Sequence, residues 1–139
     1  MLRSMTFYQD VDDFRMFEDA MEAGGIAWWV MEYPSGAVYF SPNKIKMLGY
    51  VQSDMSDFVH YTSFTNLVHP DDIDQAMKAM LDHIQGKSDA YETKYRIMAK
   101  DSTYHTFFDR GKIVAKNKDG EIAIAGIVLD ITLAGEILG

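Results

Sequence analysis

The sequence predicts an α+β domain in which a five-stranded antiparallel sheet carries short helices on one face, preceded by an amphipathic helix. Three observations support this prediction. One helical pattern is followed by two strand patterns, then by short helical segments, and finally by three strand patterns. Forming one sheet requires the two strand blocks to meet side by side, which places the last strand centrally. The last strand pattern, residues 121–132, is dense in β-branched residues, which favours a central and buried position.

The first third of the chain predicts a helix and a hairpin. In residues 10–23 the apolar positions Val11, Phe14, Phe17 and Met21 recur at helical spacing, and two glycines follow. The next segment, IAWWVMEY, is apolar on both alternating sets of positions. A strand with one solvent-exposed face would alternate, so we expect this one to be covered on both faces. Residues 34–36 (PSG) predict a turn, and AVYF predicts the partner strand.

The middle of the chain predicts short helices and one longer one. Ser41 is expected to cap a short helix with Pro42 in its first position, and Gly49 ends that helix. Residues 51–66 are expected to be loop with one short helical turn. A longer helix begins at Pro70 and ends before Gly86. Its apolar stripe consists of Ile73, Ala76, Met77, Met80, Leu81 and Ile84.

The last third predicts three strands. Residues 91–100 alternate, DST turns the chain, and residues 104–116 return. The hairpin turn NKDG then leads into the last strand. The closing LAGEILG begins a helix that is too short to be stable alone, so we expect it to continue as a linker helix.

Composition excludes several functions. The chain has 139 residues and a formal charge of −8, with thirteen Lys and Arg spread thinly, which argues against nucleic-acid binding. It has no cysteine, so disulfides, thiolate metal sites and cysteine nucleophiles are excluded. The longest uncharged apolar run, GIAWWVM, is too short to span a membrane, and no signal peptide is apparent. We expect a cytoplasmic domain without membrane contact. No nucleophile with a neighbouring base and no phosphate-binding glycine loop is visible, so we expect no enzyme activity in this segment.

The stretch LVHPDDIDQAMKAMLDHI, residues 67–84, holds two histidines and four aspartates and is a candidate for a metal or acid–base site. His69 precedes the helix and has no partner at the i, i+4 spacing that a helical metal pair needs. Pro70 fits the first helical position, and acidic residues in the first turn are stabilised by the exposed backbone N–H groups. We therefore interpret His69 and the aspartates as the start of a helix and expect no metal site.

A series of short motifs resembles the PAS (Per-Arnt-Sim) sensory domains of bacteria and archaea. The resemblance covers residues 25–132. It rests on these elements in order: Trp29 to Glu32, Ser35-Gly36, Ser41-Pro42, Leu48-Gly49-Tyr50, His69 to Asp72, Tyr95 to Ile97, Asp109 to Gly111, Lys118 to Gly120 and Asp130 to Thr132. The departures are Met31 in place of a second tryptophan, Lys94 in place of glutamate, Ser102 in place of glycine, and Thr106 where many members have tryptophan.

The resemblance implies that one face of the sheet lines a small cavity that the helices close. Strand alternation assigns the sheet residues of this candidate pocket, and apolar helix residues could close it. They are Trp29, Met31, Tyr95, Ile97, Phe107 and Val128 from the sheet, and Met47, Leu48, Met77 and Leu81 from the helices. The alternative is that these residues form a filled core, and the ten methionines suit a plastic core or a promiscuous pocket equally.

The resemblance also limits the cofactors. Some PAS domains bind haem through one helical histidine, but His83 lies off the apolar stripe, at a helix end that favours a cation. The cysteine adduct of light-oxygen-voltage domains and the thiol-linked chromophore of photoactive yellow protein need a cysteine and are excluded. We expect no cofactor or a small non-covalent ligand; haem and flavin are not expected.

The other face of the sheet must also be covered. It carries Trp28, Val30, Phe108, Ile127 and Leu129, and the N-terminal helix offers Phe14, Phe17 and Met21 for this role. A second subunit could share it, as the resemblance implies, so we expect a homodimer.

The resemblance implies a regulatory module of a signal-transduction protein, with a histidine kinase or diguanylate cyclase output domain after it. Residues 1–24 form the flanking helix, 25–132 the PAS domain and 133–139 the start of a linker. We expect Asp130 and Thr132 to relay a shift of the sheet into that linker. Two alternatives stay open: a ligand-free PAS module that only dimerises, and a cone-shaped isomerase-like α+β fold.

Overall fold

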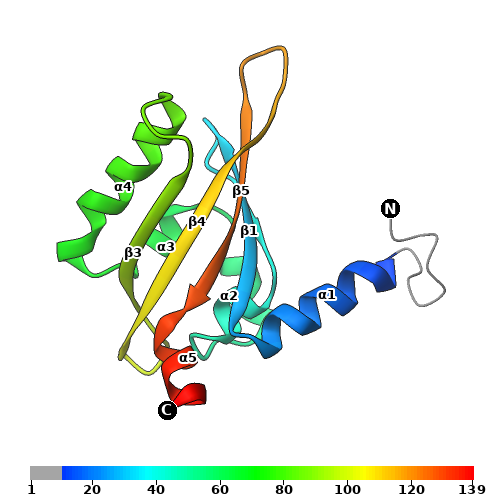
Figure 1. Ribbon diagram of the computed structural model, residues 1–139, viewed down its shortest axis with the longest axis vertical. Helices are drawn as coiled ribbons and strands as arrows, with labels where there is room; N and C mark the ends of the chain where they lie inside the picture. Colours follow the sequence, from blue (N-terminus) through cyan, green and yellow to red (C-terminus); the bar gives the residue numbers. More distant parts are fainter. Residues whose placement is uncertain (1–10) are drawn as a thin grey trace.

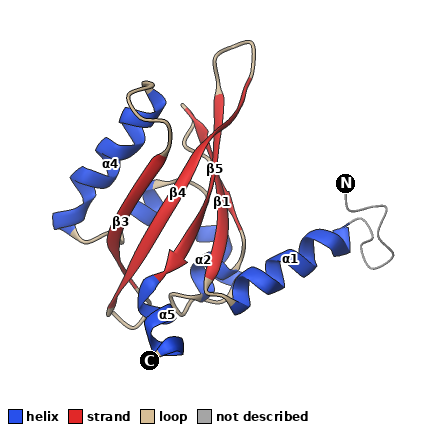
Figure 2. Cartoon of the chain, viewed as in Figure 1, coloured by secondary structure: helices blue, strands red, loops and turns tan. Residues whose placement is uncertain are grey.

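The computed structural model describes residues 11–139 and shows one five-stranded antiparallel sheet (Figures 1 and 2). Within these residues the strand order is β2-β1-β5-β4-β3, so the last strand is central and is paired on both sides. The predicted fold class and the central position of the last strand are confirmed. The strands are β1 (Ile26–Tyr33), β2 (Val38–Phe40), β3 (Tyr91–Met98), β4 (Tyr104–Lys116) and β5 (Ile122–Asp130).

The helices are arranged unevenly around the sheet (Figure 1). Helices α2, α3 and α4 lie on one face, with α4 alongside β3. Helices α1 and α5 lie at the end of the sheet that is farthest from the β4–β5 turn, and α1 points away from the sheet. The bounds are α1 (Val11–Ala23), α2 (Asn43–Lys46), the 3₁₀ helix η2 (Gln52–Asp57), α3 (Thr62–Thr65), α4 (Pro70–Ile84) and α5 (Ile131–Leu138). The part of the flanking-helix prediction that falls on residues 1–10 lies outside the described residues.

Two details of the middle segment differ from the prediction. Residues 51–66 hold two short helices, η2 and α3, and not one. Ser41 does not cap α2 with its side chain, because its hydroxyl accepts a hydrogen bond from the backbone N–H of Trp28 at 3.2 Å. The Ser-Pro pair therefore fastens α2 to strand β1, which fixes where this helix lies over the sheet.

Two glycines make room for the largest side chain of the core. Gly111 of β4 and Gly126 of β5 face each other across the ladder, and Trp29 of β1 is the partner of Gly126 on the other side. A Cβ atom built on Gly126 would lie 2.5 Å from Cζ2 of Trp29, and one on Gly111 would lie 2.9 Å from the same atom. The Trp29 indole therefore lies directly on the sheet, and any residue larger than glycine at position 111 or 126 would collide with it.

The outer face of the sheet is only partly covered. The Phe14 ring lies 5.7 Å from the Trp28 ring, and the indole N–H of Trp28 donates to Glu18 at 2.8 Å. Trp28, Val30, Phe108, Leu129 and Met21 are half-buried. However, Ile127 is 51% exposed and Phe14 52% exposed, because α1 projects away from the sheet. Helix α1 thus covers Trp28 and leaves the neighbouring apolar surface open.

Candidate functional site

A cavity of about 170 Å³ lies between the covered face of the sheet and helices α2, α3 and α4. Its volume is close to the roughly 150 Å³ of a cavity that holds benzene. The wall is mostly apolar and aromatic. It is lined by Trp29, Met31, Tyr33, Val38, Lys44, Tyr61, Phe64, Thr65, Val68, Ala76, Met77, Met80, Leu81, Ile84, Tyr91, Tyr95 and Asp109.

The predicted pocket residues divide into two groups. Trp29, Met31, Met77, Leu81 and Tyr95 line the cavity. The other five are buried in the adjoining core and do not line it: Met47, Leu48, Ile97, Phe107 and Val128. Alternation along a strand identifies which face of the sheet a side chain is on. It does not show where along the strands a space remains between that face and the helices.

Helix α4 closes the cavity incompletely. Met77 is 37% exposed and Leu81 44% exposed although both lie on the apolar stripe of the helix, so the cavity is open to solvent along α4. The stripe predicted from the sequence therefore lines a cavity wall over part of its length, where it is not packed into the core.

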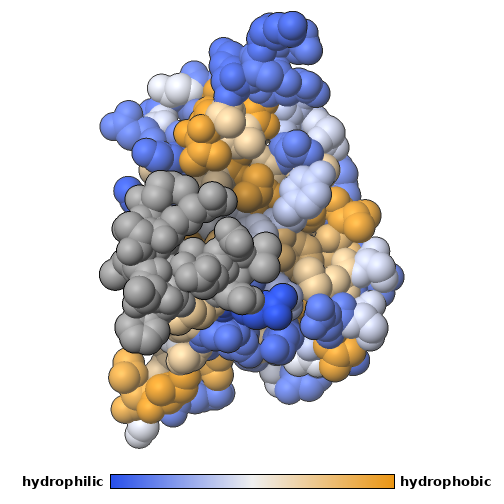
Figure 3. Space-filling model, turned by 90° about the vertical axis from the view of Figure 1, so that its right-hand side faces the viewer, coloured by the Kyte–Doolittle hydropathy of each residue, from blue (hydrophilic) through white to orange (hydrophobic). Residues whose placement is uncertain are grey.

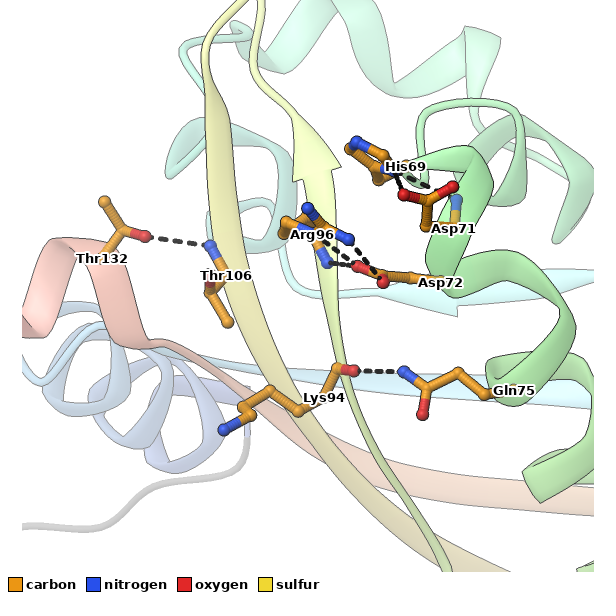
Figure 4. A network of polar contacts seen from close by, with 8 residues as sticks. All are labelled: His69, Asp71, Asp72, Gln75, Lys94, Arg96, Thr106 and Thr132. Carbon is orange, nitrogen blue, oxygen red and sulfur yellow. Dashed lines mark hydrogen bonds and ion pairs between the residues drawn. The ribbon is translucent and has the colours of Figure 1, made fainter.

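The N-terminal end of α4 is fastened to β3 by polar contacts (Figure 4). Asp72 accepts two hydrogen bonds from the Arg96 guanidinium and one from the Arg96 backbone N–H, all at 2.8–2.9 Å. These hydrogen bonds hold the pKa of Asp72 at about 2, below its ordinary 3.8. The Gln75 amide donates to the carbonyl oxygen of Lys94 at 2.7 Å. Fixing this end sets the spacing between α4 and the sheet, and hence the width of the cavity.

His83 fastens the other end of α4. It is buried, its Nε2 accepts the backbone N–H of Ile113 at 3.0 Å, and its Nδ1 lies 2.9 Å from the carbonyl oxygen of Ser88. This pattern requires the proton on Nδ1. Both ring nitrogens are therefore engaged by the backbone, and His83 has a structural role at this position.

His69 begins α4. Its Nδ1 accepts a hydrogen bond from the backbone N–H of Asp71 at 3.0 Å, which satisfies one of the free N–H groups of the first turn. Within residues 11–139, no three His, Asp or Glu side chains are close enough to hold a metal ion. The interpretation of this stretch as the start of a helix is consistent with these contacts.

The charged centre of the cavity is formed by Asp109 of β4 and Lys44 of α2, neither of which was among the predicted pocket residues. Asp109 is 4% exposed, and its two oxygens accept hydrogen bonds from the Trp29 indole N–H at 2.5 Å and the Tyr95 hydroxyl at 3.0 Å. Burial raises the pKa of Asp109 from 3.8 to about 6, although Lys44, Tyr95 and Trp29 all act in the opposite direction. The carboxylate is therefore held in an apolar wall by two aromatic donors.

Lys44 is 6% exposed, and its ammonium lies among aromatic rings. The Nζ atom is 3.9 Å from the centre of the Phe64 ring, 5.8 Å from that of Trp29 and 6.0 Å from that of Phe40. Burial lowers the pKa of Lys44 from 10.5 to about 8, and Asp109 offsets part of this effect. Burial likewise raises the pKa of Tyr91 and Tyr95 well above 10.0, with Asp109 adding to it. The cavity is thus an aromatic chamber with one buried cation and one buried anion.

Sequence reasoning could have found Asp109 but not Lys44. Asp109 lies two residues after Phe107 in β4, and residues two apart in a strand point to the same face, so strand alternation places Asp109 on the covered face. Lys44 and Lys46 are both in the one-turn helix α2, yet Lys44 is buried while Lys46 is exposed and pairs with Glu22 at 3.0 Å. Nothing in the local pattern says which of the two lysines turns inward.

The two predicted relay residues connect α5 to the beginning of β4. Asp130 is fully buried; its Oδ1 accepts the Leu133 N–H at 2.9 Å and caps α5, while its Oδ2 lies 2.7 Å from Nδ1 of His105. The Thr132 hydroxyl accepts the N–H of Thr106 at 2.9 Å (Figure 4). Strand β4 therefore carries Asp109 in the cavity wall and, a few residues earlier, both contacts to α5.

None of the helices in the described part of the chain combines the length and the hydrophobicity that crossing a membrane requires.

Comparison with known proteins agrees with this architecture. A curated sensor from Methanosarcina acetivorans, the methyl sulfide methyltransferase-associated sensor, is 30% identical over 100 residues, which is 71% of this chain and 10% of that protein. The chain thus spans about a tenth of the length of this relative. Among solved structures, a sensory box histidine kinase/response regulator from Burkholderia thailandensis superposes with a TM-score of 0.68 at 22% identity, covering 87% of this chain and 88% of that one.

A second solved structure is the N-terminal domain of a diguanylate cyclase with a PAS/PAC sensor from Marinobacter aquaeolei. It superposes with a TM-score of 0.66 at 21% identity, covering 79% of this chain and 98% of that one. The model of the PAS fold matches residues 37–128, more than half of the sequence. With the sheet order, the helices on one face and this match together, the chain belongs to the PAS-fold family.

Proposed function

We propose that this PAS domain is a non-catalytic sensory module that binds a small molecule in the aromatic cavity and passes the signal to helix α5. The observation that carries the proposal is the course of strand β4. Its residue Asp109 lies in the cavity wall, while His105 and Thr106 of the same strand contact Asp130 and Thr132 at the start of α5. A ligand that moves β4 would therefore shift the contacts that set the direction of α5.

The exposed end of α5 supports this role. Ile137 is 62% exposed and Leu138 87% exposed, and α5, at the bottom of the molecule, appears as an apolar surface in Figure 3. We propose that an output domain, of the kind named in the similar histidine kinase and diguanylate cyclase, receives the change through this helix.

The relay is tested with fragment-sized aromatic molecules. We expect any fragment that shifts the Trp29 indole N–H resonance also to change hydrogen exchange of the amides of residues 131–138 in the native chain. In Thr132→Ala, the Thr106 N–H loses its acceptor, so the fragment should still bind while the change in α5 exchange falls by more than half. Thr103→Ala is the matched control, because among the described residues the Thr103 hydroxyl donates only to nearby Asp101.

Two results would contradict the proposal. If a fragment binds near Trp29 but hydrogen exchange of the amides of residues 131–138 is unchanged, the proposed relay is wrong. Failure of every fragment to perturb Trp29, together with no retained small molecule in native mass spectra of freshly purified protein, would remove the sensor role and favour a module that only dimerises.

We also propose that the chain forms a homodimer through the partly covered outer face of the sheet. Ile127 at the centre of this face is half exposed, and Phe14 on α1 is equally open. Burying such apolar surface contributes about 25 cal/mol per Å², so a second copy placed there would gain stability.

Sedimentation velocity checks the dimer. We expect the native chain to sediment as a dimer at micromolar concentration and Ile127→Lys to sediment as a monomer. Val59→Lys, at a 64% exposed loop position away from the sheet face, should remain dimeric. A monomeric native chain, or a dimer that persists in Ile127→Lys, would rule out this interface.

A further inference from the structure

The Lys44 ammonium lies in the cavity wall without a hydrogen-bond acceptor among the described residues. Instead, its Nζ atom lies over the faces of aromatic rings, closest to the centre of the Phe64 ring at 3.9 Å, and is attracted at longer range by Asp109. An ammonium group carries three N–H donors. A ring face can satisfy one of these donors weakly. A charged N–H donor that is buried without an acceptor costs free energy. At least one donor is therefore available to a molecule in the cavity.

The charges around the cavity are balanced. Among the described residues that line it, only Lys44 and Asp109 carry formal charges, one positive and one negative. Both oxygens of Asp109 already accept a hydrogen bond, from Trp29 and from Tyr95, whereas Lys44 donates none to the residues that the structure describes. A ligand in the cavity should therefore supply a hydrogen-bond acceptor for Lys44. A ligand with a net charge would leave an unbalanced charge in an apolar wall.

Resting on the proposed sensory function, we infer that the cavity takes a small uncharged molecule with an apolar, preferably aromatic, body and one carbonyl oxygen that accepts a hydrogen bond from Lys44. The aromatic wall fits the body, and the cavity volume of about 170 Å³ limits it to about the size of a substituted benzene. The carbonyl oxygen supplies the acceptor that residues 11–139 do not.

Four probes of nearly equal shape separate the possibilities: acetophenone carries the neutral acceptor, α-methylstyrene replaces its oxygen by a CH₂ group, benzoate carries a negative charge and benzamidinium a positive one. Binding is measured by titration of the two indole N–H resonances. Trp29 lines the cavity and reports on it. Trp28 lies on the other face of the sheet, where its indole N–H bonds Glu18, and serves as the internal control.

We expect acetophenone to bind the native chain at least about tenfold more tightly than α-methylstyrene, which is the ratio that a hydrogen bond to a charged group supplies. Benzoate and benzamidinium should bind more weakly than acetophenone. Lys44→Met keeps the apolar stem but removes the ammonium, so the preference for acetophenone over α-methylstyrene should fall to about one. Lys46→Met, on the exposed side of the same helix turn, should keep the native preference.

The outcomes separate this inference from the function on which it rests. Tighter binding of benzoate or benzamidinium, equal binding of acetophenone and α-methylstyrene, or an unchanged preference in Lys44→Met would overturn the inference and leave a ligand-binding cavity in place. Absence of any Trp29 shift with all four probes would overturn the inference and the proposed ligand binding together.

Discussion

Replacing Gly126 by alanine is expected to destabilise the domain by about 3 kcal/mol or more, which is at the upper end for an overpacked core position. The added Cβ atom would overlap the carbonyl oxygen of Arg110 on β4 and lie 2.5 Å from the Trp29 ring. Strand β5 is paired on both sides, so it cannot shift away from β4 without breaking the ladder with β1. We expect the urea midpoint to fall and the Trp29 indole to move relative to Asp109.

Gly135→Ala is the matched control for this substitution. A Cβ atom on Gly135 meets nothing within 4 Å, and the residue lies inside helix α5. Alanine is favoured over glycine in a helix by about 1 kcal/mol, so this variant should be slightly more stable than the native chain. Equal stability of Gly126→Ala and the native chain would contradict the close contact between Trp29 and the central strand.

Replacing Asp109 by asparagine is expected to change how stability depends on pH. The pKa of Asp109 is raised from 3.8 to about 6 in the folded protein, chiefly by burial. Between these values the folded state holds a proton that the unfolded state has lost, so stability falls as the pH rises through this window. Each tenfold change in proton affinity corresponds to about 1.4 kcal/mol, so the native chain should lose about 3 kcal/mol from this group by pH 7.

Asp109→Asn has no proton to lose, so this decrease should be missing. The difference in unfolding free energy between the variant and the native chain should therefore grow in favour of the variant from pH 4 to 6 and then level off. Urea unfolding followed by tryptophan fluorescence at several pH values measures it. Asp119→Asn in the exposed turn before β5 controls for the loss of one negative charge. A difference that stays constant over this range would show that Asp109 titrates normally.

Local patterns predicted most of the fold because local chemistry decides it. The stripe from Ile73 to Ile84 defines α4, and the alternation of Tyr91, Tyr95 and Ile97 defines the buried face of β3. The density of β-branched residues in β5 indicated its central position, and the structure confirms this. The predicted N-terminal helix is confirmed over its described residues, but its limited cover of the sheet depends on the angle at which it leaves Gly25, which the sequence does not encode locally.

The candidate site was predicted only in part. Parity placed Trp29, Met31 and Tyr95 on the correct face, and the α4 stripe supplied Met77 and Leu81. The same rule also selected Ile97, Phe107 and Val128, which the structure places in the adjoining core, because alternation along a strand does not show where the helices leave space above the sheet. The helix candidates Met47 and Leu48 are buried in the same core. The distance of α4 from the sheet is set by Asp72 with Arg96 and by His83 with Ile113, contacts between residues more than twenty positions apart.

The sequence by itself therefore determined the strands, the longer helices and their order, the central strand and the resemblance to the PAS family, since these depend on short-range periodicity and on motifs in register. Only the tertiary structure decided that a cavity remains, that Lys44 and not Lys46 turns into it, and that Lys44 faces it without an acceptor from the described residues. The physical reason is that charge balance and hydrogen-bond satisfaction inside a cavity depend on groups from α2, β1, β3 and β4 at once. Those distances exist only after the chain has folded.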